Sequence, residues 1–250
     1  MSRRHRVPVE TLVRGELALS AEAAKYVCRV LRVAVGDSLE LFDPSEAIQA
    51  DAEVLSCEPT RVVCRVGIVS QATAIPKVKV VLVQGMSKGD RVERVMKDAT
   101  ALAVSEVMVT GCERSVLPAP HAEDTRMLRW RRIALEAARQ SGRGDVPRIT
   151  VTESLVDVMD SIREGFKVVL DPQADATLSE HLVTWERLQR IVVAVGPEGG
   201  FSPAEISEFE RQGWLRAALG PFTLRTELAP AVALAQISAH AHPKKESSLG

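Results

Sequence analysis

Aromatic side chains are scarce in this chain of 250 residues, which contains five Phe, three Trp and one Tyr, or 4% of the total. No apolar run approaches the roughly 20 residues that a membrane-spanning helix needs. Residues 2–6 also lack the apolar stretch of a secretion signal. We therefore expect a cytoplasmic protein without membrane contact, and its hydrophobic content of 46% is sufficient for a packed core.

Metal-binding patterns are absent as well. The four cysteines, Cys28, Cys57, Cys64 and Cys112, show no CxxC spacing. The five histidines are scattered, and His240 and His242 near the C-terminus are typical of a solvated surface. The sequence therefore favours buried or inert thiols, with no metal site and no disulfide framework.

The net charge of −1 conceals a strong division along the chain. Residues 1–32 hold seven Lys and Arg against three acidic residues, whereas residues 33–73 hold two against seven. Residues 126–148 are basic again, with seven Arg against two acidic residues. Basic zones of this kind bind phosphate backbones in some proteins and are solvated helix faces in others, so both alternatives stay open here.

The pattern of apolar residues divides the chain near residue 73. Alternation with period two between residues 38 and 70 predicts half-buried strands, and residues 21–31 predict a short helix. We therefore predict a small β-barrel over residues 1–73 and a linker over residues 71–76. From residue 74 to 250 strands alternate with helices, which predicts an α/β domain with a largely parallel sheet. The expected strands are 78–84, 107–109, 168–170, 191–195 and 217–219, with helices from about residue 90, over 127–138 and over 226–241.

The most informative stretch follows the apolar run Ile191–Val195, which breaks into Gly196-Pro197-Glu198-Gly199-Gly200. Ser202-Pro203-Ala204-Glu205 then has the pattern of a capping box with proline in the first turn, so a helix is expected to begin there. A strand, a glycine loop and a helix N-terminus together form a ligand-binding crevice in many α/β proteins. By spacing alone, a tight turn without a ligand fits equally well.

Taken together with four further segments, this stretch resembles the RsmE type of RNA methyltransferase in the SPOUT superfamily. The four segments occur in the family's order and span nearly the whole chain: Arg29-Val30-Leu31-Arg32 with Gly36-Asp37; Glu113-Arg114-Ser115-Val116; Arg129-Trp130 with Gln140-Ser141-Gly142-Arg143 and Pro147; and Leu219-Gly220 with Leu224-Arg225-Thr226-Glu227. The resemblance implies methylation of uridine N3 in 16S ribosomal RNA, with S-adenosylmethionine as cofactor. It also implies a PUA-like N-terminal barrel (residues 1–73), a catalytic α/β domain (residues 74–250) with a deep trefoil knot, and a homodimer that acts on 16S rRNA or the small ribosomal subunit.

The same resemblance assigns roles to particular residues. Glu198 is expected as the general base and Arg225 as the cation that stabilises the uridine anion. The alternatives are a carboxylate that interacts with the helix dipole for Glu198, and an anion clamp for Arg225. The leucines and Gly220 could equally be core and turn residues. The expected cofactor-binding residues are Leu170, Val195, Gly196, Pro197, Glu198, Gly199, Leu219, Gly220, Phe222 and Leu224. The expected RNA-binding residues are Arg4, Arg6, Arg32, Arg129, Arg132 and Arg143.

The chain also departs from the family pattern. After the motif Arg225-Thr226-Glu227, Leu228 occupies the position where the family usually has a threonine, and Pro230 follows two residues later. Near the N-terminus, Arg6-Val7-Pro8 replaces a motif with two aromatic residues. With few aromatics, base stacking is expected to be weak and phosphate contacts to dominate. Two rival functions therefore stay open: a catalytically weakened RNA-binding or ribosome-assembly module of the same fold, and a nucleotide-binding metabolic enzyme.

Overall fold

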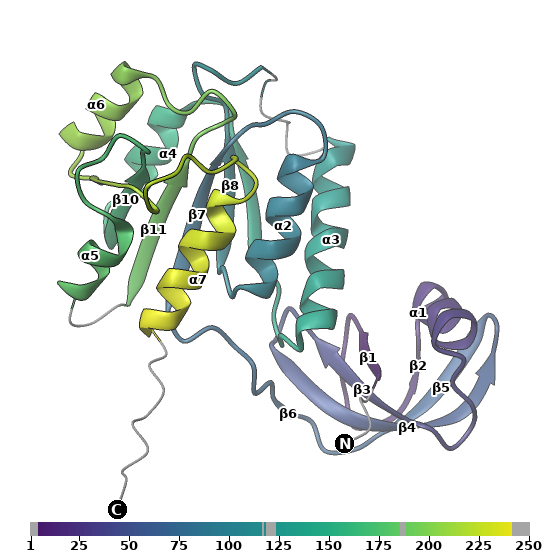
Figure 1. The fold of residues 1–250 in the computed structure, drawn as a ribbon. Coiled ribbons are helices and arrows are strands. Elements are labelled where there is room, and N and C mark those ends of the chain that lie inside the picture. The colour runs from purple at the N-terminus through teal and green to yellow at the C-terminus, as the bar shows by residue number, and fades with distance from the viewer. Residues whose placement is uncertain (1–4, 117, 119–123, 186–188, 242–250) are drawn as a thin grey trace, which may run out of the picture. The chain divides into compact units, whose positions relative to one another are not determined.

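The computed structural model describes residues 5–116, 118, 124–185 and 189–241. The chain divides into two compact units. The smaller unit comprises Met1–Ile75 together with Leu135–Val146, and the larger comprises Pro76–Ala134 together with Pro147–Gly250. Figure 1 shows the elements of both units. None of the described helices is long and apolar enough to cross a membrane.

The smaller unit contains a six-stranded sheet with the order β1-β3-β4-β5-β2, in which β6 also pairs with β4. β1 and β3 are parallel, and the other pairs are antiparallel. A core of aliphatic side chains fills it, including Leu39, Leu41, Val54 and Val62. The strands are β1 (His5–Pro8), β2 (Gly15–Ala18), β3 (Ser38–Asp43), β4 (Ile48–Glu58), β5 (Arg61–Val66) and β6 (Ser70–Gln71).

A helical segment interrupts these strands where the sequence predicts one. Helix α1 (Ala21–Tyr26) begins at Ser20, whose hydroxyl accepts a hydrogen bond from the backbone N–H of Ala23. The helix then widens into the π-helical turn η1 (Val27–Leu31) and ends at Arg32, which has a left-handed φ of 56°. The edge strands β1 and β2 were not expected, because four-residue strands carry too little alternation to be recognised.

The larger unit is built on a six-stranded sheet with the order β12-β10-β11-β7-β8-β9, and every neighbouring pair is parallel. The central strands are apolar almost throughout because both faces of the sheet are covered. The strands are β7 (Lys79–Gly85), β8 (Glu106–Thr110), β9 (Arg148–Thr152), β10 (Phe166–Leu170), β11 (Arg190–Val195) and β12 (Leu215–Ala217).

Alternate residues of β7 show how the two faces are covered. Val80 and Leu82 pack in the cluster that contains α2, α3, α5 and α7, whereas Val81 and Val83 pack in the cluster that contains α4 and α6. The unit is therefore a three-layer α/β structure (Figure 1). Its helices are α2 (Arg91–Ala101), the part of α3 (Thr125–Ser141) up to Ala134, α4 (Leu155–Ser161), α5 (Leu178–Val183), α6 (Pro203–Arg211) and α7 (Ala229–Ala241).

In the larger unit the structure differs from the prediction at both elements that flank residues 218–228, and β9, α4 and α5 were missed. The strand expected at 217–219 is β12 at Leu215–Ala217, and α7 begins at Ala229 rather than Thr226. Three residues before the helix, the hydroxyl of Thr226 donates a hydrogen bond to the carbonyl of Gly196, at 2.6 Å. Because α7 begins at Ala229, Pro230 lies in the first helical turn, where its N–H would have no helical partner in any case. β9, α4 and α5 are short, so their apolar periodicity covers too few residues to separate them from loops, although the capping box of Thr177 and Glu180 marks the start of α5.

Candidate functional site

A glycine loop, Gly196–Gly200, follows the carboxyl end of β11. At Gly196 an added Cβ would lie 2.8 Å from backbone atoms of Gly200 and Phe201, so the loop closes only with glycine there. Gly200 has a left-handed φ of 69°. From the neighbouring strand, Gly85 lies so close to Pro197 that a Cβ would meet its ring at 2.6 Å. The loop therefore packs directly on the end of β7.

The start of α6 fixes the far end of this loop. As predicted, Ser202 and Glu205 form a capping box: the Ser202 hydroxyl accepts from the Glu205 N–H, and the Glu205 carboxylate accepts from the Ser202 N–H at 2.7 Å. The other oxygen of Glu205 accepts from the backbone N–H of Glu113 at 2.8 Å. Arg114 donates to the carbonyl of Gly199 at 2.9 Å. Residues 113–114, which lie in the second segment of the resemblance, thus hold the glycine loop from outside.

Residues 219–227 pass beside the glycine loop. Thr226 joins the two segments, because its buried hydroxyl donates to Gly196 and accepts from the amide of Gln84 at 3.3 Å. Segments 30 residues apart therefore meet at the carboxyl end of the sheet. In parallel α/β sheets, this edge is where ligands usually bind.

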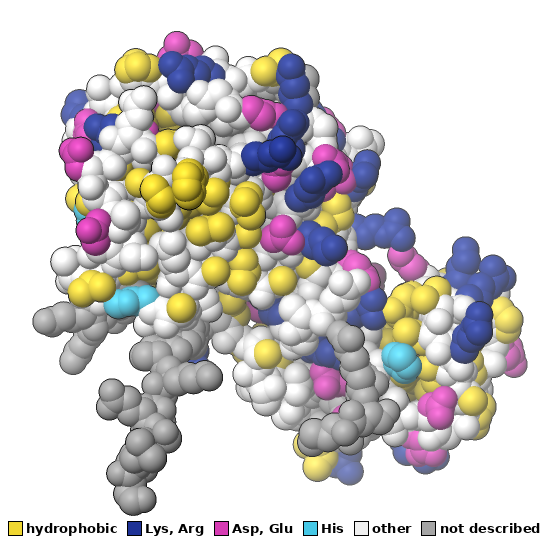
Figure 2. All heavy atoms as spheres, viewed as in Figure 1, with side chains coloured by type: hydrophobic (Ala, Val, Ile, Leu, Met, Phe, Trp, Pro, Cys, Tyr) yellow, Lys and Arg dark blue, Asp and Glu magenta, His cyan; other side chains and the backbone are white. Residues whose placement is uncertain are grey.

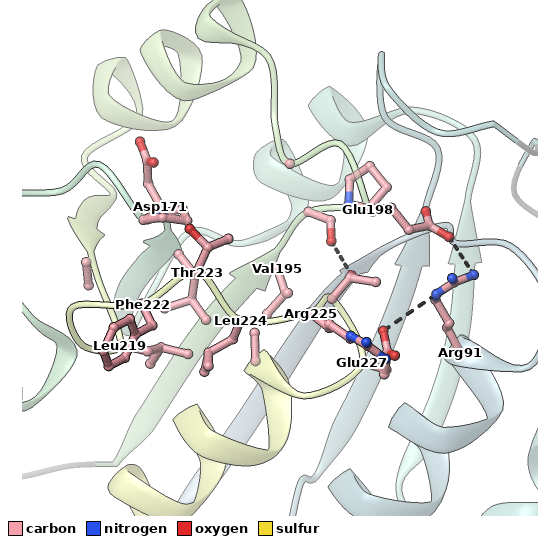
Figure 3. Close-up of a pocket in the computed structure, with 18 residues that line it drawn as sticks. Arg91, Asp171, Val195, Glu198, Leu219, Phe222, Thr223, Leu224, Arg225 and Glu227 are labelled. Carbon is pink, nitrogen blue, oxygen red and sulfur yellow. Dashed lines mark hydrogen bonds and ion pairs between the residues drawn. The ribbon is translucent and has the colours of Figure 1, made fainter.

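A cavity of about 350 Å³ lies between these two segments and the end of β10 (Figure 3). Of the expected cofactor-binding residues, eight line it, and both expected catalytic residues do so as well. Gly199 and Gly220 do not line it. The lining residues are Arg91, Leu170, Asp171, Pro172, Val195, Gly196, Pro197, Glu198, Gly200, Ala217, Leu219, Phe222, Thr223, Leu224, Arg225, Thr226, Glu227 and Ala229.

Sequence analysis did not single out Arg91, which links two carboxylates of this cavity. Its guanidinium lies 3.1 Å from Glu198 and 3.6 Å from Glu227, as the dashed lines in Figure 3 mark. Glu227 is largely buried, and its Oε2 accepts no hydrogen bond from the described residues. Arg91 stands at the start of α2 and carries no motif of its own in the sequence. The contact arises only because β7, which precedes α2, lies beside β11 in the sheet.

The two expected catalytic residues have different surroundings. Glu198 Oε1 accepts from the backbone N–H of Lys88 at 2.8 Å and pairs with Arg91, whereas its Oε2 accepts no hydrogen bond from the described residues. Arg225 is exposed, and within the described residues its guanidinium forms no ion pair or hydrogen bond. It is therefore available to an anionic ligand.

A second charge pair stands at the end of β10. Asp171 accepts two hydrogen bonds from the guanidinium of Arg216, at 2.7 and 3.2 Å. This hydrogen bonding raises the pKa of Arg216. The pair ties the residue after β10 to β12 and so fixes this rim of the cavity.

The residues expected to bind RNA separate into two groups. Arg6 and Arg143 are largely buried within the smaller unit: Arg6 pairs with Glu40 and donates to the Arg143 carbonyl at 2.9 Å, and Arg143 pairs with Asp145 at 2.6 Å. Arg32, Arg129 and Arg132 are exposed, and Arg129 also pairs with Glu93 at 2.7 Å. Arg4 lies outside the described residues.

Basic side chains also gather on one part of the larger unit. Figure 2 shows dark blue side chains, mixed with acidic ones, over the face where α2 and α3 lie. The described residues include no group of three His, Cys, Asp or Glu side chains that could hold a metal ion.

A glycine loop and a largely apolar cavity outside the carboxyl ends of parallel strands define a cofactor-binding α/β protein. The family model for RNA methyltransferase domains matches residues 74–238, and the chain belongs to this family.

Individual relatives agree with this assignment. Ribosomal RNA small subunit methyltransferase E of Bacillus subtilis is 27% identical over 228 residues, which are 88% of this chain and 89% of the relative. A methyltransferase structure from Legionella pneumophila, solved with bound S-adenosylmethionine, is 29% identical with a TM-score of 0.86, and the match covers 96% of this chain and 98% of that one. The ribosomal RNA small subunit methyltransferase E of Neisseria gonorrhoeae, at 23% identity and a TM-score of 0.83 over 95% of this chain and 98% of that one, shows the same fold.

Proposed function

We propose that this protein transfers a methyl group from S-adenosylmethionine to N3 of a uridine in 16S ribosomal RNA. The observation that carries the proposal is the cavity between Gly196–Gly200 and residues 219–227, in a chain that matches RNA methyltransferases over most of its length. The Legionella relative holds S-adenosylmethionine, and the Bacillus subtilis relative is a methyltransferase of small-subunit rRNA.

The cavity suits this cofactor in size and chemistry. A volume of about 350 Å³ lies within the range of small-molecule sites, roughly 300 to 1,000 Å³. Leu170, Leu219 and Leu224 offer apolar surface for an adenine ring, and Phe222, 80% exposed at the rim, would cover it from outside. The Oε2 of Glu227, which pairs with Arg91 at 3.6 Å but accepts no hydrogen bond from the described residues, would be an acceptor for a hydroxyl or ammonium group. Gly196 and Pro197 bring backbone groups to the same wall.

The cofactor supplies an already activated methyl group, so the protein must align the reactants and manage one proton. Neutral uridine holds its N3 proton too tightly at pH 7 to be a good nucleophile. We assign the unpaired oxygen of Glu198 to accept that proton and the exposed guanidinium of Arg225 to stabilise the resulting anion. Arg91 would hold Glu198 in place while this happens.

RNA would contact the exposed arginines, with Arg129 and Arg132 on the larger unit and Arg32 on the smaller one. Arg4 is proposed as a further contact on sequence grounds. Arg6 and Arg143 are proposed to order this surface from within, because their guanidinium groups already pair with Glu40 and Asp145.

Several finer features belong to the same proposal. Residues 1–73 would act as a PUA-like RNA-binding barrel and residues 74–250 as the SPOUT domain. Residues 196–200 and 219–227, which Thr226 joins, would be the walls of a trefoil knot. A cytoplasmic homodimer would complete the RNA site across its subunits.

The decisive experiment supplies the purified protein with S-adenosylmethionine and small ribosomal subunits, or free 16S rRNA, from a strain without this modification. Nucleoside mass spectrometry should then detect N3-methyluridine, and its absence from both substrates would refute the proposal. Calorimetric titration with the cofactor distinguishes the rival functions. A non-catalytic RNA module would bind RNA without turnover, and a metabolic enzyme would show no salt-sensitive affinity for RNA.

A further inference from the structure

Two thiols of the smaller unit lie in direct contact. The sulfurs of Cys28 and Cys57 are 2.8 Å apart, although the residues are 29 positions apart in the sequence. This separation exceeds the length of a disulfide bond by only about 0.8 Å. Both side chains are partly exposed, whereas Cys64 is completely buried.

The hydrogen bonds around the pair leave the two sulfurs facing each other. Cys28 donates its proton to the carbonyl of Glu58 in β4, at 3.2 Å. Cys57 donates to the carbonyl of Val33, just after the π-helical turn, also at 3.2 Å. Each thiol can therefore donate to backbone of the opposite segment, and either thiol can also donate to the other sulfur. The two sulfurs are already in contact, so a covalent bond can form between them with little movement.

The segments that carry the pair are locally irregular. Cys28 lies in the π-helical turn η1, and π-helical turns are frequent at functional sites. Cys57 lies in β4 next to a register shift between Val54 and Ser56. Arg32 follows the turn with a left-handed backbone. A bond between the cysteines would fix the turn to the sheet at this irregular point.

We propose that Cys28 and Cys57 form a reversible disulfide when the protein meets a low-molecular-weight disulfide. This redox-responsive link lies in the smaller unit and is independent of the proposed methyltransferase function. Disulfides that form inside cells are mostly transient and redox-sensing.

The chemistry proceeds by two exchanges. The thiolate of Cys28 attacks one sulfur of the small disulfide, whose S–S bond breaks and releases one small thiol. Cys57 then loses its proton to solvent and attacks the Cys28 sulfur, which releases the second small thiol and forms the protein disulfide. The two cysteines are oxidised by two electrons and the reagent is reduced by two. Burial and the hydrogen bond with Cys28 raise the pKa of Cys57 to about 11, so Cys57 stays protonated until the second exchange.

The test treats the full chain with oxidised glutathione and maps its peptides without reduction. We expect a peptide pair joined through Cys28 and Cys57, a loss of two hydrogen atoms, and reversal by dithiothreitol. The bond should raise the midpoint of thermal unfolding of the smaller unit by about 10 °C, because it closes a 29-residue separation in the unfolded chain.

Matched variants separate this pair from the other thiols. Cys28→Ser and Cys57→Ser should each abolish the linked peptide and the shift in midpoint. Cys112→Ser should behave as the wild type, because the thiol of Cys112 donates to the carbonyl of Thr110 in the larger unit and does not belong to the contacting pair. Glutathione left attached to Cys28 without a second exchange, or no oxidation of Cys28 at all, would overturn the proposal. Peptide mapping of the wild-type protein decides the matter even if a serine variant fails to fold.

Discussion

Arg91 joins carboxylates that lie more than a hundred positions later in the chain, in the two segments that form the cavity. Its side chain is 38% exposed, so each ion pair alone is weak. Its value lies in geometry, because one guanidinium fixes the glycine loop relative to residues 219–227. Such a residue affects the shape of the proposed cofactor site more than the stability of the fold.

Replacing Arg91 therefore tests the proposed cofactor site. Arg91→Ala should weaken S-adenosylmethionine binding about fivefold, or ~1 kcal/mol, because Glu198 and Glu227 lose their common partner. Isothermal titration calorimetry measures the affinity directly. Arg94→Ala is the matched control, since Arg94 is one turn further along α2 and pairs with Asp90 outside the cavity. Equal affinities in wild type and Arg91→Ala would contradict the role given to Arg91.

Arg225 differs from Arg91 because its guanidinium has no partner among the described residues. Arg225→Ala should lower kcat about a hundredfold, or ~3 kcal/mol, while affecting cofactor affinity far less, since the charge would act on the developing uridine anion. Arg225→Lys should recover part of the loss because it keeps the positive charge. In the wild type the rate should rise with pH, since deprotonation of N3 becomes easier. A fall in kcat that only matches the fall in cofactor affinity would make Arg225 a binding residue.

At the scale of elements, the glycine loop connects β11 to α6 and forms one wall of the cavity. Gly196→Ala should reduce cofactor affinity at least tenfold and destabilise the fold by about 1 to 3 kcal/mol, because its Cβ would meet backbone at 2.8 Å. Calorimetry and thermal unfolding measure the two effects.

Gly199→Ala provides the internal comparison for that prediction. Gly199 was expected to bind the cofactor, but it faces Arg114 rather than the cavity, and its Cβ would meet the Cβ of Arg114 at 3.2 Å. Its replacement should change cofactor affinity less than twofold. If Gly199→Ala and Gly196→Ala lowered cofactor affinity equally, the affinity would depend on the conformation of the whole loop. The prediction that only the residues lining the cavity matter would then be wrong.

Local patterns account for what the sequence could predict about these elements. The capping box at Ser202 and Glu205, and the strand–loop–helix around Gly196, depend on neighbouring residues and were predicted correctly. Arg91 was missed because its partners depend on the order of β7 and β11 in the sheet, which no local pattern encodes. Arg6 and Arg143 were counted as basic surface, since a charge count does not show which guanidinium groups are buried in ion pairs.

The whole molecule consists of two units whose boundary falls inside α3. The basic zone of residues 126–148 is therefore divided. Arg129 and Arg132 belong to the larger unit, whereas Arg139 and Arg143 belong to the smaller one. Arg139 is held there, with its guanidinium 4.7 Å from the ring centre of Tyr26. Arg129 and Arg132 combine exposure with membership of the unit that contains the cavity.

This division gives a prediction for RNA binding. Arg129→Glu with Arg132→Glu should weaken RNA binding and flatten its dependence on salt, because each lost phosphate contact lowers the slope of log K against log salt by about 0.7 to 0.9. Filter binding at several salt concentrations measures that slope, and calorimetry should show unchanged affinity for S-adenosylmethionine. Arg211→Glu on α6 is the matched control, because Arg211 is 70% exposed and pairs with Glu208 much as Arg129 pairs with Glu93. If the slope of log K against log salt were the same in the double variant and in the control, this part of α3 would be a solvated helix face. The RNA contacts would then lie elsewhere.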